Sequence, residues 1–424
     1  MNSKLLAIVA VIVVVIAGLG VYAVVNHDDE EKVVETDRLL IYGNVNNDDV
    51  IDDKDLTLLK QMIDGDKEPS ALADVNADGT LDDKDVEKLQ DIIDKKAKTV
   101  FYYNAMYKKP YETPYPLKNI VVASPQPTMS VMLLGPEDKA AGTAEPADTA
   151  LFAGIKADEL WEVNKAYQWN VGVTKVSNLP AEKKADAVIT TIETYAMNTE
   201  KDFEDAKIPV IRLDVRGTSS ISAALMIGFL CGAEEKAEKF VGYIDKVQKE
   251  IDSKTSKVAE DKKVSAMIVS KSDVYGNESG FTSCIKLAGA NLAVEVPETS
   301  RAIGDKEWLN NVAPDYVLAY TTVTKYAYDT ASAITYWEQF TGIYDFFDSV
   351  PDNFMFVGYY LPDTLRAAYL AEVFYPDQFE KGYGDKIHQE YVDSFLSALH
   401  DAKYDVTKDG NFLITKEDYQ ALKA

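Results

Sequence analysis

The sequence predicts an α/β protein of two lobes joined by one long spine helix, preceded by a small all-α module and an N-terminal membrane helix. Three observations lead to this fold class. A helical pattern runs without interruption through the middle of the chain, and alternating strand and helix patterns lie on both sides of it. An acidic repeat and a long apolar run come before them. The 424 residues suffice for two or three domains, each with its own core.

The central pattern lies within residues 232–258 and predicts a helix over 233–257. One apolar stripe recurs at helical spacing, at Ala237, Phe240, Val241, Ile244, Val247 and Ile251. At about 1.5 Å per residue such a helix is roughly 30 Å long, close to the diameter of a small domain. We therefore expect a spine between an N-terminal lobe (119–232) and a C-terminal lobe (258–402), with a cleft between them. The alternative is an ordinary crossover helix within one large α/β domain.

Composition excludes several classes of function. The net charge of −26 opposes nucleic-acid binding, which needs a basic patch. Cys231 and Cys284 fall in opposite predicted lobes, where a disulfide would lock a hinge, so both are predicted to be buried thiols. The three histidines do not cluster, which opposes a His-rich zinc site. No nucleophile elbow, P-loop or dinucleotide-binding glycine pattern is present, so we do not expect an enzyme.

The chain begins with a candidate membrane span. Residues 5–25 are apolar throughout, enough to cross about 30 Å of hydrocarbon. Lys4 precedes this run and acidic residues follow it, which places the remainder outside the cell. We predict an uncleaved signal anchor (1–27) and an acidic spacer (28–39), and hence a single-pass protein with its bulk on the cell surface. A cleaved signal peptide is the alternative.

Two acidic segments 30 positions apart form the most specific motif, and each precedes a helix pattern. Both place oxygen donors at positions 1, 3, 5, 9 and 12 of a twelve-residue loop, with the position-7 carbonyl as a further donor, which is the pattern that Ca²⁺ requires. The predicted ligands in the first loop are Asn44, Asn46, Asp48, Val50, Asp52 and Asp55. Those in the second are Asp74, Asn76, Asp78, Thr80, Asp82 and Asp85.

This duplicated loop–helix pattern over residues 40–98 resembles a type I dockerin, a calcium-binding module that docks on cohesin domains. The resemblance implies two Ca²⁺ ions and a cohesin partner that contacts Asp53-Lys54 and Asp83-Lys84. The first loop departs from the pattern with Asn44 at position 1 and Asp49 in place of glycine at position 6, so weaker calcium binding is expected there. An acidic surface hairpin without metal is the alternative.

Two further segments complete the division of the chain. Residues 99–118 carry three prolines and five tyrosines, and predict a semi-rigid extended linker. The tail (403–424) contains a third loop-like set at Asp405, Thr407 and Asp409. Its twelfth position is Lys416, which cannot bind a cation, so we expect a turn there.

From Asn119 the order of elements resembles the long-helix class of ABC-importer solute-binding proteins, which bind iron–siderophore complexes, haem and cobalamin. The residues that carry this likeness are NIVVASPQPTMSVMLLG, LPAEKKADAVITT, IPVIRLD, GFLCGAEEKAEKFVGYIDKVQKEI, FTSCIKLAGANLAVEV, WLNNVAPDYVLAY and YLAEVFYPDQF. The resemblance implies two Rossmann-like α/β lobes, little hinge motion and a metal-chelate or cofactor ligand between the lobes.

The ligand site is expected beyond the carboxyl ends of the strands, where α/β sheets bind their ligands. Two arginines are placed to clamp an anionic group, and tyrosines offer flat surface for a chelate. The alternative for each arginine is a surface residue or an interlobe ion pair. The predicted ligand-binding residues are Ser124, Gln126, Tyr195, Arg216, Tyr275, Arg301 and Tyr359.

One departure from that class bears on its partner. Its members carry a glutamate in the first helix that docks on the permease, whereas Met129 stands at that position here. The leading hypothesis is a membrane-anchored solute-binding protein, with permease docking through that contact in doubt. The alternative is a surface adhesion or scaffold protein that uses dockerin–cohesin pairing and a degenerate binding domain.

Overall fold

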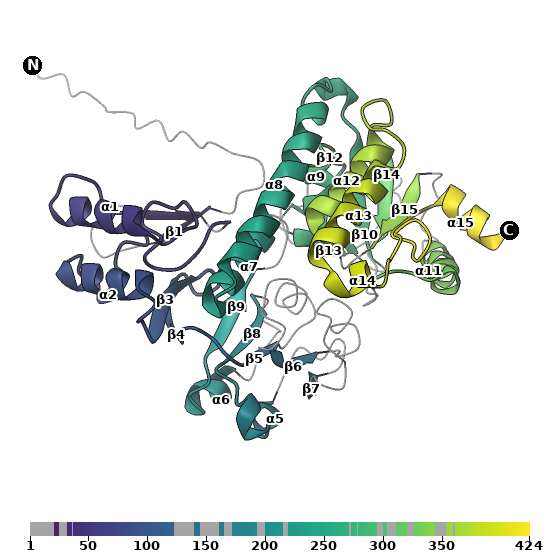
Figure 1. Cartoon of the computed structure of the whole chain (residues 1–424). Helices are drawn as coiled ribbons and strands as arrows, with labels where there is room; N and C mark the ends of the chain where they lie inside the picture. Colours follow the sequence, from purple (N-terminus) through teal and green to yellow (C-terminus); the bar gives the residue numbers. More distant parts are fainter. Residues whose placement is uncertain are drawn as a thin grey trace, which may run out of the picture.

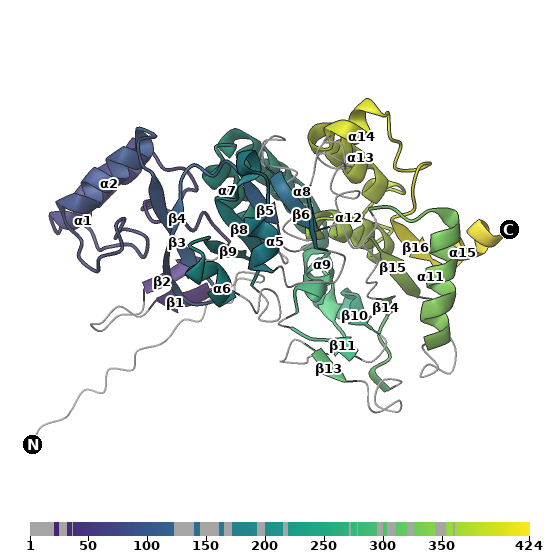
Figure 2. The same cartoon turned by 90° about the horizontal axis from the view of Figure 1, so that it is seen from below.

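The fold is two α/β lobes on either side of one long helix, with a small helical module at one end (Figure 1). This computed structural model describes residues 21–24, 32–35, 37–122, 140–144, 161–164, 172–192, 200–214, 219–270, 273–277, 279–294, 300–302, 311–319, 326–343, 353–358 and 361–424. The module and the C-terminal lobe lie at opposite ends of the molecule (Figure 2). The predicted architecture of lobe, spine and lobe is confirmed.

The spine is α8 (Glu234–Thr255), a helix of 22 residues. Its buried side chains include the whole apolar stripe that the sequence predicts. The helix packs against α7 (Ser219–Cys231) on one side and α12 (Asp363–Phe374) on the other. The α7 contact is close because Gly228 has no side chain: a Cβ there would lie 2.4 Å from Cβ of Ala237.

The N-terminal lobe is built on a parallel sheet in the order β7-β6-β5-β8-β9. Strands β5, β8 and β9 are buried along their whole length, which fits their mainly apolar sequences. Because β9 lies at the end of this order, it is an edge strand. The elements are β5 (Ile120–Val122), β6 (Ala140–Ala144), β7 (Trp161–Asn164), α5 (Val173–Ser177), η2 (Ala181–Lys183), β8 (Ala187–Thr191), α6 (Glu200–Asp205) and β9 (Val210–Leu213).

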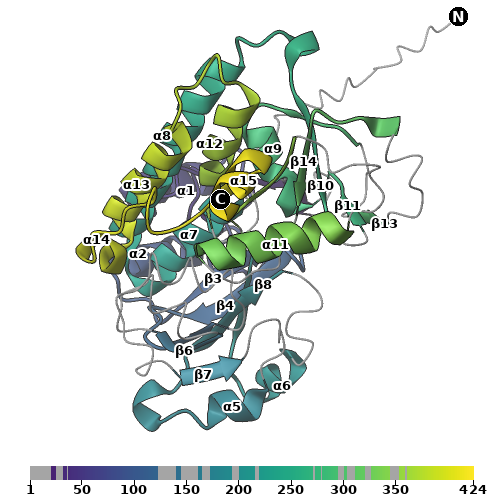
Figure 3. The same ribbon diagram turned by 90° about the vertical axis from the view of Figure 1, so that its right-hand side faces the viewer.

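The C-terminal lobe holds a mixed sheet in the order β13-β11-β10-β14-β15-β16, with β12 also paired to β10. In Figure 3 this lobe faces the viewer, and α11 and α15 lie in front. Its strands are β10 (Ser265–Val269), β11 (Asp273–Tyr275), β12 (Asn291–Leu292), β13 (Ser300–Ala302), β14 (Tyr316–Ala319), β15 (Phe354–Val357) and β16 (Leu413–Thr415). Its helices are η3 (Glu260–Lys262), η4 (Gly280–Thr282), α9 (Ser283–Leu287), α11 (Thr330–Ile343), α12, α13 (Tyr383–Phe395), α14 (Ser397–Asp401) and α15 (Lys416–Lys423). Since β16 pairs with β15, the expected tail is part of this lobe.

The helical module consists of two loop–helix units, with helices α1 (Asp53–Ile63) and α2 (Asp83–Ile93). Each helix begins with a capping box, formed by Asp52 with Asp55 and by Asp82 with Asp85. Buried residues of the module, of α7 and α8 and of part of the C-terminal lobe form one contiguous core. The module is therefore packed on the lobe.

The expected linker over residues 99–118 is a β-hairpin, which corrects the prediction of an extended spacer. Strand β3 (Thr99–Asn104) pairs antiparallel with β4 (Lys109–Pro114). On its other side β3 forms a bridge with Ile41, just before the first loop. The hairpin thus lies between the module and the N-terminal lobe.

The N-terminal membrane span is expected in a part of the chain that lies mostly outside the described residues. Its last residues form strand β1 (Val21–Val24), which pairs with β2 (Lys32–Glu35), so a helix is not present over those four residues. In the portions of the chain that the structure describes, no helix has the length and apolar character needed to cross a bilayer.

Candidate functional site

The two acidic loops have the same backbone conformation. Each has left-handed residues at positions 4 and 6, with φ of 58° at Asn47 and 71° at Asp49 in the first loop. The corresponding angles are 54° at Ala77 and 85° at Gly79. The sequence repeat is therefore a structural repeat, and Asp49 adopts the strained conformation that was expected where glycine is missing.

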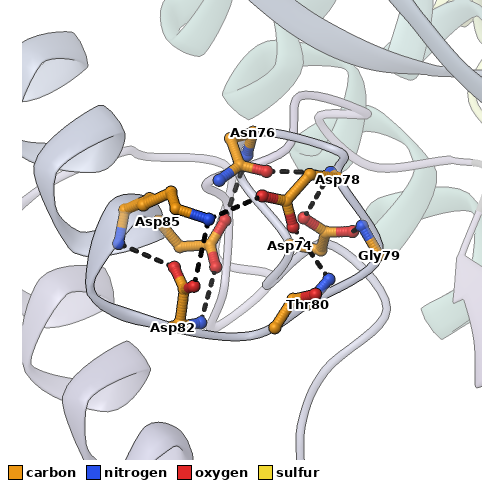
Figure 4. A network of polar contacts seen from close by, with 8 residues as sticks. Asp74, Asn76, Asp78, Gly79, Thr80, Asp82 and Asp85 are labelled. Carbon is orange, nitrogen blue, oxygen red and sulfur yellow. Dashed lines mark hydrogen bonds and ion pairs between the residues drawn. The ribbon is translucent and has the colours of Figure 1, made fainter.

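The polar side chains of the second loop point toward one another (Figure 4). The Asp74 carboxylate accepts hydrogen bonds from the Gly79 N–H at 2.8 Å and the Asp78 N–H at 3.2 Å. Asp85, which is fully buried, accepts from the Asn76 N–H at 3.1 Å and from the Asp82 N–H at 2.9 Å. These bonds hold carboxylate oxygens on the inner side of the loop.

A lysine at position 11 lies beside the carboxylates of positions 5 and 9 in both loops. Lys84 Nζ is 3.3 Å from Asp78 Oδ2 and 3.3 Å from Asp82 Oδ2. Lys54 Nζ is 3.1 Å from an Asp52 oxygen and 3.6 Å from an Asp48 oxygen. Within the described part of the chain, no three His, Cys, Asp or Glu side chains gather in a group that could hold a metal. A cation entering either loop would therefore have to displace this ammonium group.

The donor chemistry of the loops nevertheless fits a hard cation. Both supply carboxylate, amide and carbonyl oxygens at the spacing that Ca²⁺ favours. In the first loop, Asn44 is only 1% exposed, and its Oδ1 has no hydrogen-bond partner among the described residues. A buried acceptor without a partner costs about 1–3 kcal/mol, which a bound cation would offset. Burial also raises the pKa of the Asp55 and Asp74 carboxyls.

Asp49 points out of the first loop and ties it to the preceding segment. Its Oδ1 accepts from the Leu39 N–H at 2.8 Å, and its Oδ2 lies 3.1 Å from Arg38 Nη1. Burial raises the pKa of this carboxyl. Asp49 therefore adds negative charge beside the loop without joining the donor set.

The predicted ligand residues of the N-terminal lobe lie outside the described residues, but the strands that precede them are described. Ser124, Gln126, Tyr195 and Arg216 follow β5, β8 and β9 in the chain. These three strands are parallel neighbours, so their carboxyl ends meet at one edge of the sheet. Tyr359 and Met129 also lie outside the described residues.

In the C-terminal lobe, the structure brings together the segments of two predicted residues. Tyr275 ends β11, and its partner in the adjacent strand β13 is Ser300, next to Arg301. The Tyr275 ring packs at 5.1 Å from the Phe281 ring in an edge-to-face arrangement, and burial raises its pKa. Tyr275 is therefore partly held by its own lobe, and it is only partly buried, which leaves some of its surface for contact.

Two buried polar clusters are absent from the predicted site. Arg212 on β9 is 4% exposed and bonds Glu200 through Nε at 2.8 Å and Nη2 at 2.7 Å. Tyr107, from the hairpin, donates to the same Glu200 carboxylate at 3.0 Å. The second cluster joins His388 to two tyrosines. The arginine inside the apolar run IPVIRLD indicates the Arg212 cluster, whereas nothing local in the sequence indicates the His388 cluster.

The predictions of buried thiols and of a C-terminal turn are confirmed. Cys231 in α7 and Cys284 in α9 are buried thiols in opposite lobes, and burial raises the pKa of Cys284 to about 11. The C-terminal loop-like set forms a turn, in which Asp405 N–H donates to Asp409 Oδ2 at 2.7 Å.

Two α/β lobes, one long spine helix and strand ends that meet at one sheet edge match the arrangement that the resemblance to solute-binding proteins implies. The model of the periplasmic binding protein family matches residues 120–334, and the chain belongs to that family. A comparison with curated protein sequences finds no match.

Solved structures share the fold at low sequence identity. The TroA-like periplasmic binding protein FepB of Veillonella parvula has a TM-score of 0.55 at 15% identity, with 74% of this chain and 98% of that one covered. CeuE of Helicobacter pylori, in a nickel–histidine complex, has a TM-score of 0.52 at 12% identity, covering 72% and 99%. MolA of Haemophilus influenzae, bound to molybdate, has a TM-score of 0.50 at 17% identity, covering 70% and 98%.

Proposed function

We propose that this chain captures an anionic metal chelate or cofactor of the iron-siderophore, haem or cobalamin type between its two lobes and delivers it to an ABC importer. The observation that carries the proposal is the membership of residues 120–334 in the periplasmic binding protein family, on a lobe–spine–lobe fold. The nickel–histidine and molybdate complexes of structurally similar proteins support a metal-containing or anionic ligand.

The proposed ligand site combines residues from both lobes. Ser124, Gln126, Tyr195 and Arg216 would contribute from the N-terminal lobe, and Tyr275, Arg301 and Tyr359 from the C-terminal lobe. Each arginine would make charge-assisted bonds to the ligand, worth about 1.5–3 kcal/mol. Arg301 lies on β13 opposite Val274 of β11, one position from the Tyr275–Ser300 pair.

A thermal-shift screen of ferric siderophores, haemin, cobalamin, molybdate and nickel–histidine tests this proposal. We expect at least one of them to raise the melting temperature, and Arg216→Ala or Arg301→Ala to weaken its binding by about tenfold to a hundredfold. Lys249→Ala is the control for the loss of one positive charge, because Lys249 is exposed on α8 and is not among the predicted ligand-binding residues. Stabilisation by none of these compounds would contradict the proposal.

We further propose that the helical module is dockerin-like and binds two Ca²⁺ ions, more tightly in the second loop. The oxygen donors of both loops and the unpartnered Asn44 Oδ1 support this. Calorimetric titration of the full chain should reveal two calcium sites, and Asp85→Ala should remove the tighter one. Asp91→Ala, an exposed change on the same helix, is the control. Absence of calcium binding to the unmodified chain would refute this part.

The second candidate function is attachment to a cohesin-bearing surface protein. It is favoured by one observation, namely that Asp53, Lys54, Asp83 and Lys84 are all exposed although the module is packed on the lobe. Calcium-dependent capture of purified cohesin domains, together with no response in the ligand screen, would favour adhesion over transport.

Membrane anchoring through residues 1–27 is proposed from the apolar run alone. The full-length protein should sediment with membranes, and its C-terminal part should be cleaved by external protease. A soluble mature form beginning near residue 26 would indicate a cleaved signal peptide.

A further inference from the structure

We infer that calcium binding to the first loop controls the order of the edge strand β9, from which the predicted Arg216 loop departs. The inference rests on the proposed calcium site and deepens it, because it assigns the module a regulatory role toward its own solute-binding lobe. Three consecutive contacts join the loop to this strand.

The first contact joins the loop to the segment Leu39–Tyr42, which we call the coupling segment. Asn44 Nδ2 donates to the Leu39 carbonyl at 3.0 Å, and Asp49 accepts from the Leu39 N–H at 2.8 Å. The loop itself is closed by Asp55, which accepts from the Val45 N–H at 2.7 Å. All four residues of the coupling segment are buried in the core, and these bonds fix its backbone at the end that meets the loop.

The second contact joins the coupling segment to the hairpin. Tyr42 N–H donates to the Phe101 carbonyl at 3.0 Å, and Tyr103 N–H donates to the Leu40 carbonyl at 2.8 Å. The segment therefore pairs with β3 on the side that β4 leaves open. Loosening of the first loop would release one side of β3.

The third contact joins the hairpin to β9. The Tyr102 hydroxyl, which is fully buried, donates to the Val210 carbonyl at 3.4 Å. Tyr107 reaches Glu200, which pairs with Arg212 on the same strand. Since β9 ends the order of the described strands in the N-terminal sheet, the Tyr102 hydroxyl serves a carbonyl at the edge of that sheet.

Charge explains why calcium would govern these contacts. The first loop carries Asp48, Asp49, Asp52 and Asp55 within eight positions, and the single charge of the exposed Lys54 offsets Asp48 and Asp52 in part. A divalent cation in place of that ammonium group would hold the loop closed more firmly. An open loop loses the bonds to Leu39, and local opening then passes to β3 and β9. Calcium thereby sets how firmly the sheet holds the start of the ligand loop that follows β9.

Hydrogen exchange of the full chain, followed by mass spectrometry with Ca²⁺ or with a calcium chelator, tests this inference. Peptides that cover 40–42, 101–103 and 210–213 should exchange at least about tenfold faster without calcium. Strand β10 in the other lobe is the internal reference, and its exchange should not change. Calorimetry on the same sample measures calcium binding separately.

Variants distinguish the steps of the path. Asp48→Asn alters an exposed ligand of the first loop, so more calcium should be needed to protect β9, whereas Asp66→Asn, beyond α1, should behave as the unmodified chain. Tyr102→Phe should preserve the calcium effect at the coupling segment and reduce it at β9. If calcium binds and the exchange of β9 stays the same, the coupling is refuted and the calcium proposal stands. If calcium does not bind, both are refuted.

Discussion

His388 on α13 is the centre of a buried hydrogen-bond chain that makes stability depend on pH. The Tyr326 hydroxyl lies 2.6 Å from its Nε2, and the Tyr369 hydroxyl lies 3.0 Å from its Nδ1. Tyr369 also donates to Asp385 Oδ1 at 3.0 Å, so it must accept the proton on Nδ1. Nε2 then accepts from Tyr326. With a neutral ring, each donor and acceptor of this chain has a hydrogen-bond partner. Burial lowers the pKa of His388 to about 3.

The size of the effect follows from the two pKa values. An unfolded histidine has a pKa of about 6.5, so between about pH 6.5 and pH 3 the unfolded chain binds a proton that the folded chain does not. The folded state therefore has its full stability above pH 6.5, and loses about 1.4 kcal/mol for each pH unit below it. Between pH 7 and pH 5 the loss from this one residue is about 2 kcal/mol.

Urea unfolding at pH 7 and pH 5 measures this loss. The variant His388→Gln has no ionisable group at this position, so its free energy of unfolding should fall by about 2 kcal/mol less than that of the unmodified chain. Ser394→Ala is the control, since Ser394 is exposed on the same helix and has no ionisable side chain, so the pH dependence should stay as it is. Equal losses in the His388 variant and the unmodified chain would refute the reasoning.

Three further predictions concern stability and calcium. Glu200→Gln leaves the buried guanidinium of Arg212 without its counter-charge and should cost about 3 kcal/mol in urea unfolding; a loss below about 0.5 kcal/mol would contradict this. Gly289→Ala places a Cβ 2.4 Å from the Thr255 Cβ at a φ of +76°, so it should lower the free energy of unfolding by about 1–3 kcal/mol, and an unchanged melting temperature would count against it. Asp85→Ala should abolish the calcium-induced rise in melting temperature of the second loop–helix unit, and a full calcium response would contradict that role.

The spine and the loop–helix units could be predicted because their signals are local. Each apolar position of the α8 stripe is buried in the structure, since a helix with one apolar face has a single way to bury it. The loop spacing likewise fixes where α1 and α2 begin, because Asp52 and Asp82 serve as N-caps. The His388 chain could not be foreseen, as Tyr326 and His388 are 62 positions apart.

The sequence predicts an extended linker over residues 99–118 because proline favours extended backbone, but nothing local shows that two parts of this segment pair as a hairpin. Pro110 and Pro114 both lie in β4, opposite Tyr103 and Thr99. N–H groups of successive residues point to opposite sides of a strand. The Tyr115 N–H donates to the Lys98 carbonyl across the pair, so it points toward β3. The two prolines therefore take positions whose N–H would point away from β3, where an edge strand tolerates them.

The position of that hairpin changes how the helical module is understood. A module joined by an extended spacer would fold and bind partners independently of the solute-binding lobe. Here the coupling segment, β3 and β9 are joined through hydrogen bonds between buried residues, and the three regions share one core. Separating the module would expose that core and uncover the edge of the N-terminal sheet. The module is therefore a structural part of the lobe, and a partner that binds its exposed face would act on the sheet that ends in β9.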